Sequence, residues 1–294
     1  MSLTTKERIK ASIVTHSVAE DSPPLASIQV TFPRIILAEV NTHRVFSRNY
    51  RSSRAVPVTR LIQEVRTTPY EPIVWLKNRP GMQATEPMSP EEIELARREW
   101  HKAANQAADT AEYLMKIGLH KQWANRCLEP YLYVHGIITS VEWDNFFALR
   151  RHSDAQPEFE ALANAIYDAL SKSVPRVLLP GEWHLPYVTD SEQNSLVPTD
   201  LIKLSVARVA RVSYFNFEGK EPNPEADLKL YDKLVGSVPI HASPAEPQAT
   251  PDEYVYEDRQ WMNSHLHGNL RGWVQYRKYL EKETTGWSSP RYVI

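Results

Sequence analysis

Proline outnumbers glycine by more than two to one in this chain, with 22 prolines and nine glycines among its 294 residues. Glycine-rich loops hold phosphate groups through backbone N–H groups, because a residue without a side chain lets the backbone approach the ligand closely. The sequence contains neither a glycine-rich phosphate loop nor the Gly-x-Gly-x-x-Gly fingerprint of a dinucleotide-binding unit. We therefore expect any bound nucleotide to be held by side chains and helix ends.

The overall composition is that of an ordinary globular protein, with 42% hydrophobic residues, 24% charged residues and a net charge of −2. Cys127 is the single cysteine, which excludes an intramolecular disulfide and a zinc finger. The polar segment Met1–Lys10 lacks the apolar core of a signal peptide, and no apolar run reaches the length of a membrane span. We expect a cytoplasmic protein with one domain over residues 1–294 and a weak internal boundary near residues 191–199.

Hydrophobic periodicity predicts a mixture of strands and helices. Apolar and polar residues alternate over Leu25–Phe32, which predicts a half-buried strand. Ser89-Pro90-Glu91-Glu92 has the form of a capping box and predicts the start of a long amphipathic helix. Further helices are expected over 35–40, over most of 123–149, from Pro157 and from near Asn269.

The segment Thr42–Arg54 concentrates polar side chains, with four arginines, one histidine, one asparagine and three serines. From Arg34 to Arg60 there are six arginines, no lysine and one acid, Glu39. The planar guanidinium group grips phosphate or carboxylate through two bonds, whereas lysine is a flexible point charge. The segment is typical of a site for a phosphorylated ligand, although a solvated basic loop has the same composition. The net charge argues against non-specific nucleic-acid binding.

The spacing within this arginine motif (Thr42–Arg54) resembles the signature of the flavin-dependent thymidylate synthases, Arg-His-Arg-x-x-Ser-x-Asn-Glu-x-Ser-x-Arg. Six of its eight fixed positions are matched, by His43, Arg44, Ser47, Asn49, Ser52 and Arg54. Thr42 and Tyr50 stand where the family has arginine and glutamate.

Four further blocks resemble segments of the same family. They are Arg126 with Pro130, Asn145–Arg150 with Asp154–Glu158, Ala210–Tyr214, and His241–Glu246. In the usual order of the family the last two blocks precede the arginine motif, whereas here they follow it. The chain therefore resembles a circularly permuted member of the family, which is reasonable where termini lie close together at a surface.

The resemblance implies a fold and an activity. It implies an α+β fold like that of the thymidylate synthase-complementing proteins, with a mixed or antiparallel sheet and flanking helices in permuted order. It implies reductive methylation of dUMP to dTMP, with methylenetetrahydrofolate as the one-carbon donor, FAD as the hydride source and NADPH as the reductant of FAD. It also implies a homotetramer with active sites at subunit interfaces, small-molecule nucleotide and folate substrates, and neither a membrane nor a nucleic-acid partner.

The resemblance further implies roles for individual residues. Arg150 is expected to face the pyrimidine carbonyls, where a fixed cation stabilises developing negative charge. Substrate contacts are expected from Glu39, Tyr50, Ser52, Arg54, Arg126 and Arg150, of which Ser52 and Arg150 are the catalytic candidates. Cofactor contacts are expected from His43, Arg44, Asn145, Ser213, His241 and Ser243.

Each of these residues has a plainer structural alternative. Ser52 could be a nucleophile in principle, but no His/Asp pairing in the sequence supports a triad, so we favour a phosphate or backbone contact. His43 could be a structural histidine, Arg150 could make a surface ion pair of little energetic value, and His241 could be exposed and idle.

The C-terminal part offers no convincing metal site. His265 and His267 lack cysteine or carboxylate neighbours at ligand spacing, so we predict no catalytic metal. Trp273 and Tyr276 are at helical spacing and are expected in the core or in a subunit interface.

Thr42 and Tyr50 leave the substrate open. Together these two residues remove one cation and one anion relative to the family, which preserves the local charge balance. The alternative is that they indicate a different pyrimidine substrate or a different transferred group. dCMP is one alternative substrate, since cytosine presents an amino group where uracil presents a carbonyl. Hydroxymethylation is another alternative, and a non-catalytic protein that binds nucleotide or nucleic acid through its arginines is the third.

Overall fold

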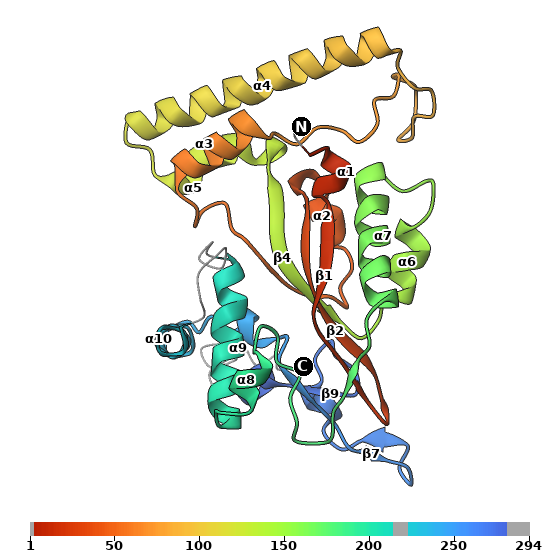
Figure 1. The fold of residues 1–294 in the computed structure, drawn as a ribbon, viewed down its shortest axis with the longest axis vertical. Coiled ribbons are helices and arrows are strands. Elements are labelled where there is room, and N and C mark those ends of the chain that lie inside the picture. Colours follow the sequence, from red (N-terminus) through yellow and green to blue (C-terminus); the bar gives the residue numbers. More distant parts are fainter. Residues whose placement is uncertain (1–2, 214–222, 281–294) are drawn as a thin grey trace, which may run out of the picture.

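The computed structural model describes residues 3–213 and 223–280, and a five-stranded sheet lies at their centre (Figure 1). The strands follow the order β3-β4-β2-β1-β5. They are β1 (Lys10–Ala19), β2 (Ser22–Pro33), β3 (Ser47–Tyr50), β4 (Tyr133–Ser140) and β5 (Arg176–Val177). The strand pairs are antiparallel except for β1 with β5, which run parallel. A mixed sheet with flanking helices confirms the expected α+β class.

The predicted strand over Leu25–Phe32 is confirmed as the central part of β2. Its apolar residues Ile28, Val30 and Phe32 are fully buried in the main core. Helices α6 (Asp144–Arg150) and α7 (Pro157–Ser171) supply the other side of this core, and α7 confirms the helix expected from Pro157. The opposite face of the sheet carries polar side chains and is contacted by α9 (Pro198–Ser213) along β3 and β4.

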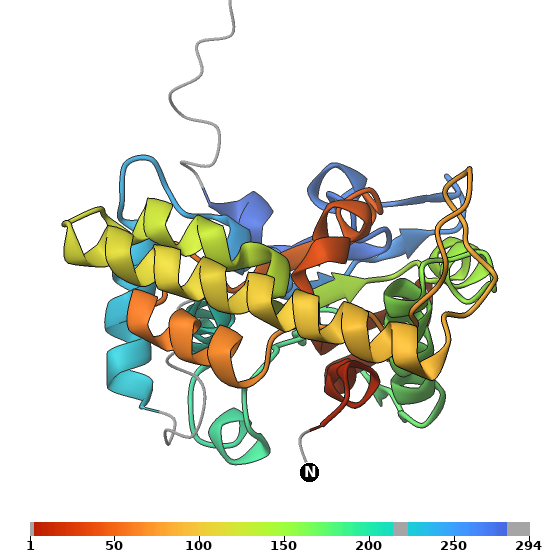
Figure 2. The ribbon, with the colours of Figure 1, turned by 90° about the horizontal axis from the view of Figure 1, so that it is seen from above.

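A helical layer covers one end of the sheet, and its main member is the long helix α4 (Pro90–Lys116), which Figure 2 shows running across the molecule. Ser89 and Glu92 form the predicted capping box. The alanines of α4 pack on α3 (Val58–Thr67), while α5 (Lys121–Ala124) and the 3₁₀ segment η2 (Asn125–Tyr131) complete the layer. Short α1 (Thr5–Arg8) lies beneath it. No helix in the described ranges is both long and apolar enough to cross a membrane.

The C-terminal part adds three helices and two small two-stranded sheets. The helices are α8 (Asp190–Gln193), α9 and α10 (Pro224–Val235). Buried Arg208 on α9 forms two ion pairs, one with Glu192 on α8 at 2.6 Å and one with Asp227 on α10 at 2.9 Å. The hydrogen bonds from Arg208 are the main reason why the pKa of Glu192 falls to about 2. Strand β6 (Ala249–Pro251) pairs with β9 (Trp273–Gln275), and β7 (Tyr254–Val255) pairs with β8 (Gln260–Trp261). Short 3₁₀ segments η3 (Ser243–Ala245), η4 (Ser264–Leu266) and η5 (Tyr276–Tyr279) lie before β6, between β8 and β9, and after β9.

The helix expected over most of 123–149 is confirmed at both ends, by α5, η2 and α6, but is wrong at the centre, and the helix expected from near Asn269 is wrong. The centre of 123–149 forms strand β4, which lies between β2 and β3 and buries Val134, Ile137 and Ile138 on both of its faces. A strand buried on both faces has no clear alternation, so its pattern resembles that of a buried helix. The helix expected from near Asn269 is strand β9 followed by η5, because Trp273 is buried and its indole N–H donates to the carbonyl of Pro23 at 2.8 Å.

Candidate active site

The arginine motif begins as a bonded turn after η1 (Arg34–Ile36) and α2 (Leu37–Val40), which confirm the helix expected over 35–40. The Thr42 hydroxyl donates to the carbonyl of Glu39 at 2.6 Å. One guanidinium N–H of Arg48 donates to the carbonyl of Asn41 at 2.8 Å. The motif continues as β3 and then as a loop that leads to α3. Its residues therefore lie at three separate places: beside Arg150, beside Glu129 of η2, and beside the segments that carry the two late blocks.

His43 and Arg150 meet at the first of these places. The Nε–H of Arg150 donates to Nε2 of His43 at 3.1 Å, and the guanidinium carbon lies 4.3 Å from the centre of the Phe159 ring. The imidazole of His43 is buried against Phe46 and Phe146, with ring centres 5.6 and 5.1 Å away. An arginine that is hydrogen-bonded at Nε and stacked on a ring has a fixed direction, while its remaining N–H groups are available to a ligand.

The protonation state of His43 follows from this contact. Because Nε of arginine is always a donor, Nε2 of His43 must accept, so the imidazole proton is on Nδ1. Burial lowers the pKa of His43, and the nearby charges of Arg150 and Arg48 lower this pKa further. The imidazole is therefore neutral at pH 7 and orients Arg150 without repelling it.

Glu129 organises the second place, where the motif meets η2. Its Oε1 accepts from the Ser53 hydroxyl at 2.6 Å and lies 3.0 Å from Arg34 and 2.7 Å from Arg126. Buried Asn125 donates to the carbonyls of Ser53 and Val56 and so fixes the loop. Arg34, Arg126 and Glu129 line a shallow pocket of about 620 Å³. Two cations against one carboxylate give this surface a net positive charge that suits an anionic ligand.

The other predicted substrate residues do not line this pocket. Ser52 is half-buried in the fixed loop, and Arg54 is exposed next to Ser53. Glu39 is exposed on α2, one turn before the motif. Tyr50 packs edge-on against Phe32 at 5.7 Å, and burial raises the pKa of its phenol. In the described part of the chain the Tyr50 hydroxyl is buried without a hydrogen-bond partner.

The third place joins the motif to the two late blocks. The Ser47 hydroxyl donates to the Glu246 carboxylate, which also forms an ion pair with Arg277. The Asn49 amide donates to the carbonyl of Val209 on α9 at 3.4 Å. Helix α9, in which the first late block begins, and Glu246, which ends the second, therefore pack against β3, although they lie about 160 to 200 residues further along the chain.

Apart from His43, the predicted cofactor residues lie on segments that lead to these places. Asn145 is exposed on α6, the helix that ends with Arg150, and Arg44 is exposed next to His43. His241 and Ser243 are exposed on the segment that leads to Glu246. Ser213 is the last residue of α9, and its side chain lies outside the described residues.

Sequence reasoning missed three residues that shape these places. Glu129 is three residues after Arg126, a spacing that signals an ion pair on a helical turn. Phe159 has no such signal, and the block His241–Glu246 indicates no partner for its glutamate, because these residues reach Arg150 and Ser47 only through the tertiary fold. Across residues 3–213 and 223–280, no group of three or more His, Cys, Asp or Glu side chains is arranged to hold a metal ion.

Solved structures similar to this chain include the UMP/dUMP methylase PolB from Streptomyces cacaoi. The form bound with 5-Br UMP is 17% identical, with a TM-score of 0.46, and the match covers 56% of this chain and 89% of that one. The form bound with 5-Br dUMP is 16% identical, with a TM-score of 0.44, and the match covers 56% and 90%. No curated protein matches the chain.

A family model settles the relationship. The model described as "Thymidylate synthase complementing protein" matches residues 15–176. The match contains the arginine motif, Arg126 and the block that ends with Arg150, whereas the late blocks lie beyond it. Because the match spans more than half of the 294 residues, the chain belongs to the thymidylate synthase complementing protein family.

Proposed function

We propose that this chain catalyses the reductive methylation of dUMP to dTMP. Membership of the family supports C5 methylation of a pyrimidine nucleotide. The one-carbon donor in the proposal is methylenetetrahydrofolate, the cofactor is FAD, and the reductant is NADPH. The observation that carries the proposal is the fixed guanidinium of Arg150, which neutral His43 and Phe159 hold beside the arginine motif.

The proposed role of Arg150 is electrostatic. When a nucleophile such as hydride adds to the pyrimidine ring, negative charge develops on the ring carbonyls. A cation that is oriented beforehand stabilises this charge without reorganising. Arg150 meets that condition, since a hydrogen bond and a ring contact fix its direction.

The nucleotide phosphate is proposed to bind near Glu129. Arg126 and Arg34 provide planar donors there, and exposed Arg54 lies on the adjoining loop. Half-buried Ser52 adds a hydroxyl on the same loop. Glu129 neutralises only part of this charge, so a phosphate dianion remains favoured.

The donor set of the motif fits a flavin. Exposed Arg44 suits a diphosphate, and exposed Asn145, His241 and Ser243 can donate to or accept from ring and ribose groups. His43 contributes indirectly in this proposal, because its Nε2 is taken by Arg150 and its ring is enclosed by phenylalanines. When bound, FAD would supply the hydride that completes the methyl group.

A subunit interface is part of the proposal. Tyr113, Ile117 and Trp123 lie at the end of α4 and in α5, and each exposes about 60% of its surface. Large apolar side chains that gather on a surface mark interaction sites. We propose that they join copies of the chain into a homotetramer, which light scattering after gel filtration would test against a monomer.

Two measurements test the proposed activity. The visible spectrum of the purified protein should show a bound flavin, and this spectrum should shift when dUMP is added. Tritium should be released from C5-labelled dUMP when methylenetetrahydrofolate and NADPH are present. Bound flavin without tritium release would refute methylation of dUMP, and a protein that takes up no flavin would refute the flavin-dependent mechanism.

A pair of neighbouring arginines provides a matched test of the site. Arg150→Ala should lower kcat/KM by about 100-fold or more, because it removes charge stabilisation in the transition state. Arg151→Ala should change it less than about twofold, since Arg151 stacks on Tyr167 at 3.5 Å and donates to Asn164, away from His43. Equal losses for both variants, or a loss for Arg150→Ala that follows thermal stability alone, would show that Arg150 is structural.

Modification of a different pyrimidine nucleotide is the second candidate function. Tyr50 is packed on Phe32 at a position where the family pattern has glutamate, so this position supplies no carboxylate to the substrate. Mass analysis of products from dUMP and dCMP distinguishes the two candidates. A methylated or hydroxymethylated dCMP product with no dUMP product would replace the first proposal by the second.

A further inference from the structure

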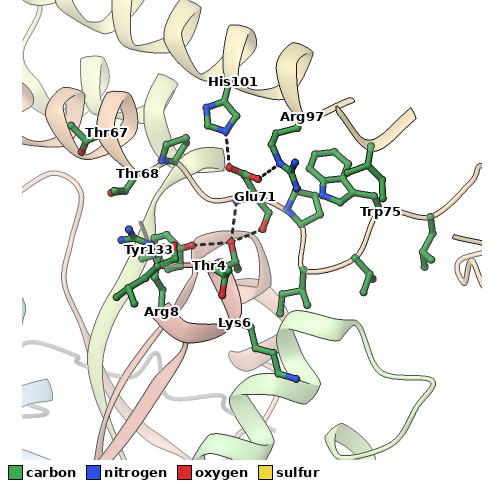
Figure 3. A pocket seen from close by; sticks show the side chains of 18 of the residues that line it. Thr4, Lys6, Arg8, Thr67, Thr68, Glu71, Trp75, Arg97, His101 and Tyr133 are labelled. Carbon is green, nitrogen blue, oxygen red and sulfur yellow. Dashed lines mark hydrogen bonds and ion pairs between the residues drawn. The ribbon is translucent and has the colours of Figure 1, made fainter. Parts of the chain in front are cut away.

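A cavity lined by none of the residues of the arginine motif lies beside α1 and α4 (Figure 3). It has a volume of about 810 Å³ and is bounded by α1, the segment after α3, the first half of α4 and the start of β4. None of its lining residues belongs to the three places of the candidate active site. Its volume is in the range of small-molecule sites, on the order of 300–1,000 Å³.

One wall of this cavity is apolar and stiff. Prolines and aliphatic side chains of the segment after α3 form it together with Trp75 and with Ile93 of α4. Trp75 packs edge-on against Trp100, with ring centres 6.1 Å apart, so its indole is held by a neighbouring ring. A wall of this kind accepts a planar ring without reorganising.

The floor is polar and centred on Glu71, which Figure 3 shows between His101 and Arg97. Nε2 of His101 lies 2.6 Å from one carboxylate oxygen, and Nε of Arg97 donates to the other at 3.0 Å. The Thr5 hydroxyl donates to the Glu71 carbonyl at 2.7 Å and accepts from the Tyr133 hydroxyl at 3.1 Å. A carboxylate has about four acceptor positions, so Glu71 can also accept from a ligand N–H.

The charge of the cavity is positive. Lys6, Arg8 and Arg97 line it, against the single carboxylate of Glu71. Within the described ranges Lys6 and Arg8 form no ion pair, and the Nε of Arg8 donates to the carbonyl of Leu3 at 3.1 Å. A smaller cavity of about 250 Å³ continues from Arg8 and Tyr133 and adds Lys10. Unneutralised cations beside an apolar wall favour an anionic ligand.

We propose that this cavity is a second binding site, for a small molecule of nucleotide size that joins a planar ring to an anionic group. The ring lies on the wall with Trp75, and its N–H groups donate to Glu71. The anionic group lies near Lys6 and Arg8. The site is independent of the proposed methylation, and its ligand binds in addition to the substrate.

Isothermal titration of the full-length protein tests the proposal, with excess dUMP present to occupy the substrate site. The probes are dTTP, GTP and folic acid, which present a pyrimidine, a purine and a pteridine, and inorganic triphosphate, which has no ring. We expect at least one ring-bearing probe to bind, and inorganic triphosphate to bind more weakly. If all three ring-bearing probes bind more weakly than on the order of 1 mM, the proposal is overturned.

Three variants locate any binding. Arg8→Gln removes a cation and Val74→Glu places a negative charge on an exposed position of the wall, so each should weaken binding by about tenfold or more. Arg98→Gln on the outer surface of α4 is the matched control and should leave affinity unchanged. Binding that is equal in all three variants would place the probe elsewhere and overturn the proposal. Thermal unfolding of each variant without ligand, measured in parallel, shows whether the variants remain folded.

Discussion

Acid should destabilise this protein through His184. The side chain is fully buried, with Nδ1 2.8 Å from the Ser17 hydroxyl and Nε2 2.8 Å from the Ser27 hydroxyl. Its backbone N–H donates to the carbonyl of Ala249 at 2.8 Å, so it joins the sheet to the C-terminal part. Burial is the main cause that lowers the pKa of His184 from 6.5 to about 3, with a smaller contribution from His16.

The sign and size of the effect follow from proton linkage. Above pH 6.5 the histidine is neutral in both the folded and the unfolded chain, so it adds no pH dependence. Between pH 6.5 and about 3 the unfolded chain binds a proton that the folded chain does not bind. Each pH unit in this window lowers the free energy of unfolding by roughly 1.4 kcal/mol, which amounts to about 2 kcal/mol at pH 5.

Urea unfolding at pH 7 and pH 5, at one protein concentration, measures this effect. Because the pKa of His135 is also lowered, to about 4, the wild type is compared with His184→Gln. The variant should be less stable at pH 7, where it loses hydrogen bonds, but its deficit should shrink by about 2 kcal/mol at pH 5. The control variant His152→Gln replaces an exposed histidine, so its difference in stability from the wild type should be the same at pH 7 and pH 5. Parallel stability profiles for wild type and His184→Gln would refute the reasoning.

Three further changes test individual contacts. Tyr50→Phe should raise the free energy of unfolding by up to about 1 kcal/mol, because it removes a buried hydroxyl without a partner; urea unfolding checks this, and a loss of dUMP affinity would instead show that the hydroxyl reaches the nucleotide. Gly136→Ala should lower the free energy of unfolding by about 1–3 kcal/mol, since an added Cβ would overlap the Tyr50 ring. This cost should be smaller when Tyr50 is also replaced by alanine, and equal costs with and without Tyr50 would exclude the overlap as the cause. Ser47→Ala should cost about 1–3 kcal/mol and should speed amide exchange around Glu246, whose carboxylate loses a buried donor; unchanged exchange would mean that other contacts hold the late block.

The elements with local signals could be predicted from the sequence. The strand β2 shows alternation because one of its faces is apolar and the other is polar. Helix α4 begins where Ser89 and Glu92 satisfy each other's backbone groups, a pattern that needs only four residues. In β4 such a signal is missing, because its burial on both faces depends on β2 and β3, which are distant in the sequence.

The candidate active site likewise has features that the sequence indicates and features that only the fold brings about. The arginine motif, Arg126 and the block ending in Arg150 are recognisable from residue types and spacing, and the family match covers them. Their assembly is not recognisable, since the contact of Arg150 with His43 spans 107 positions and that of Ser47 with Glu246 spans 199. Nothing in the spacing of Thr5, Glu71 and His101 indicated the cavity that they share.

The sequence by itself determined the family and the helices and strands whose caps and periodicity are local. The tertiary structure alone decided which motif residues are exposed and which are buried. His43 and Tyr50 belong to the same motif as Arg44 and Arg54, yet His43 is buried and Tyr50 is half-buried, whereas Arg44 and Arg54 are exposed. The physical reason is that burial and hydrogen-bond partners come from segments far apart in the chain, which no local pattern records.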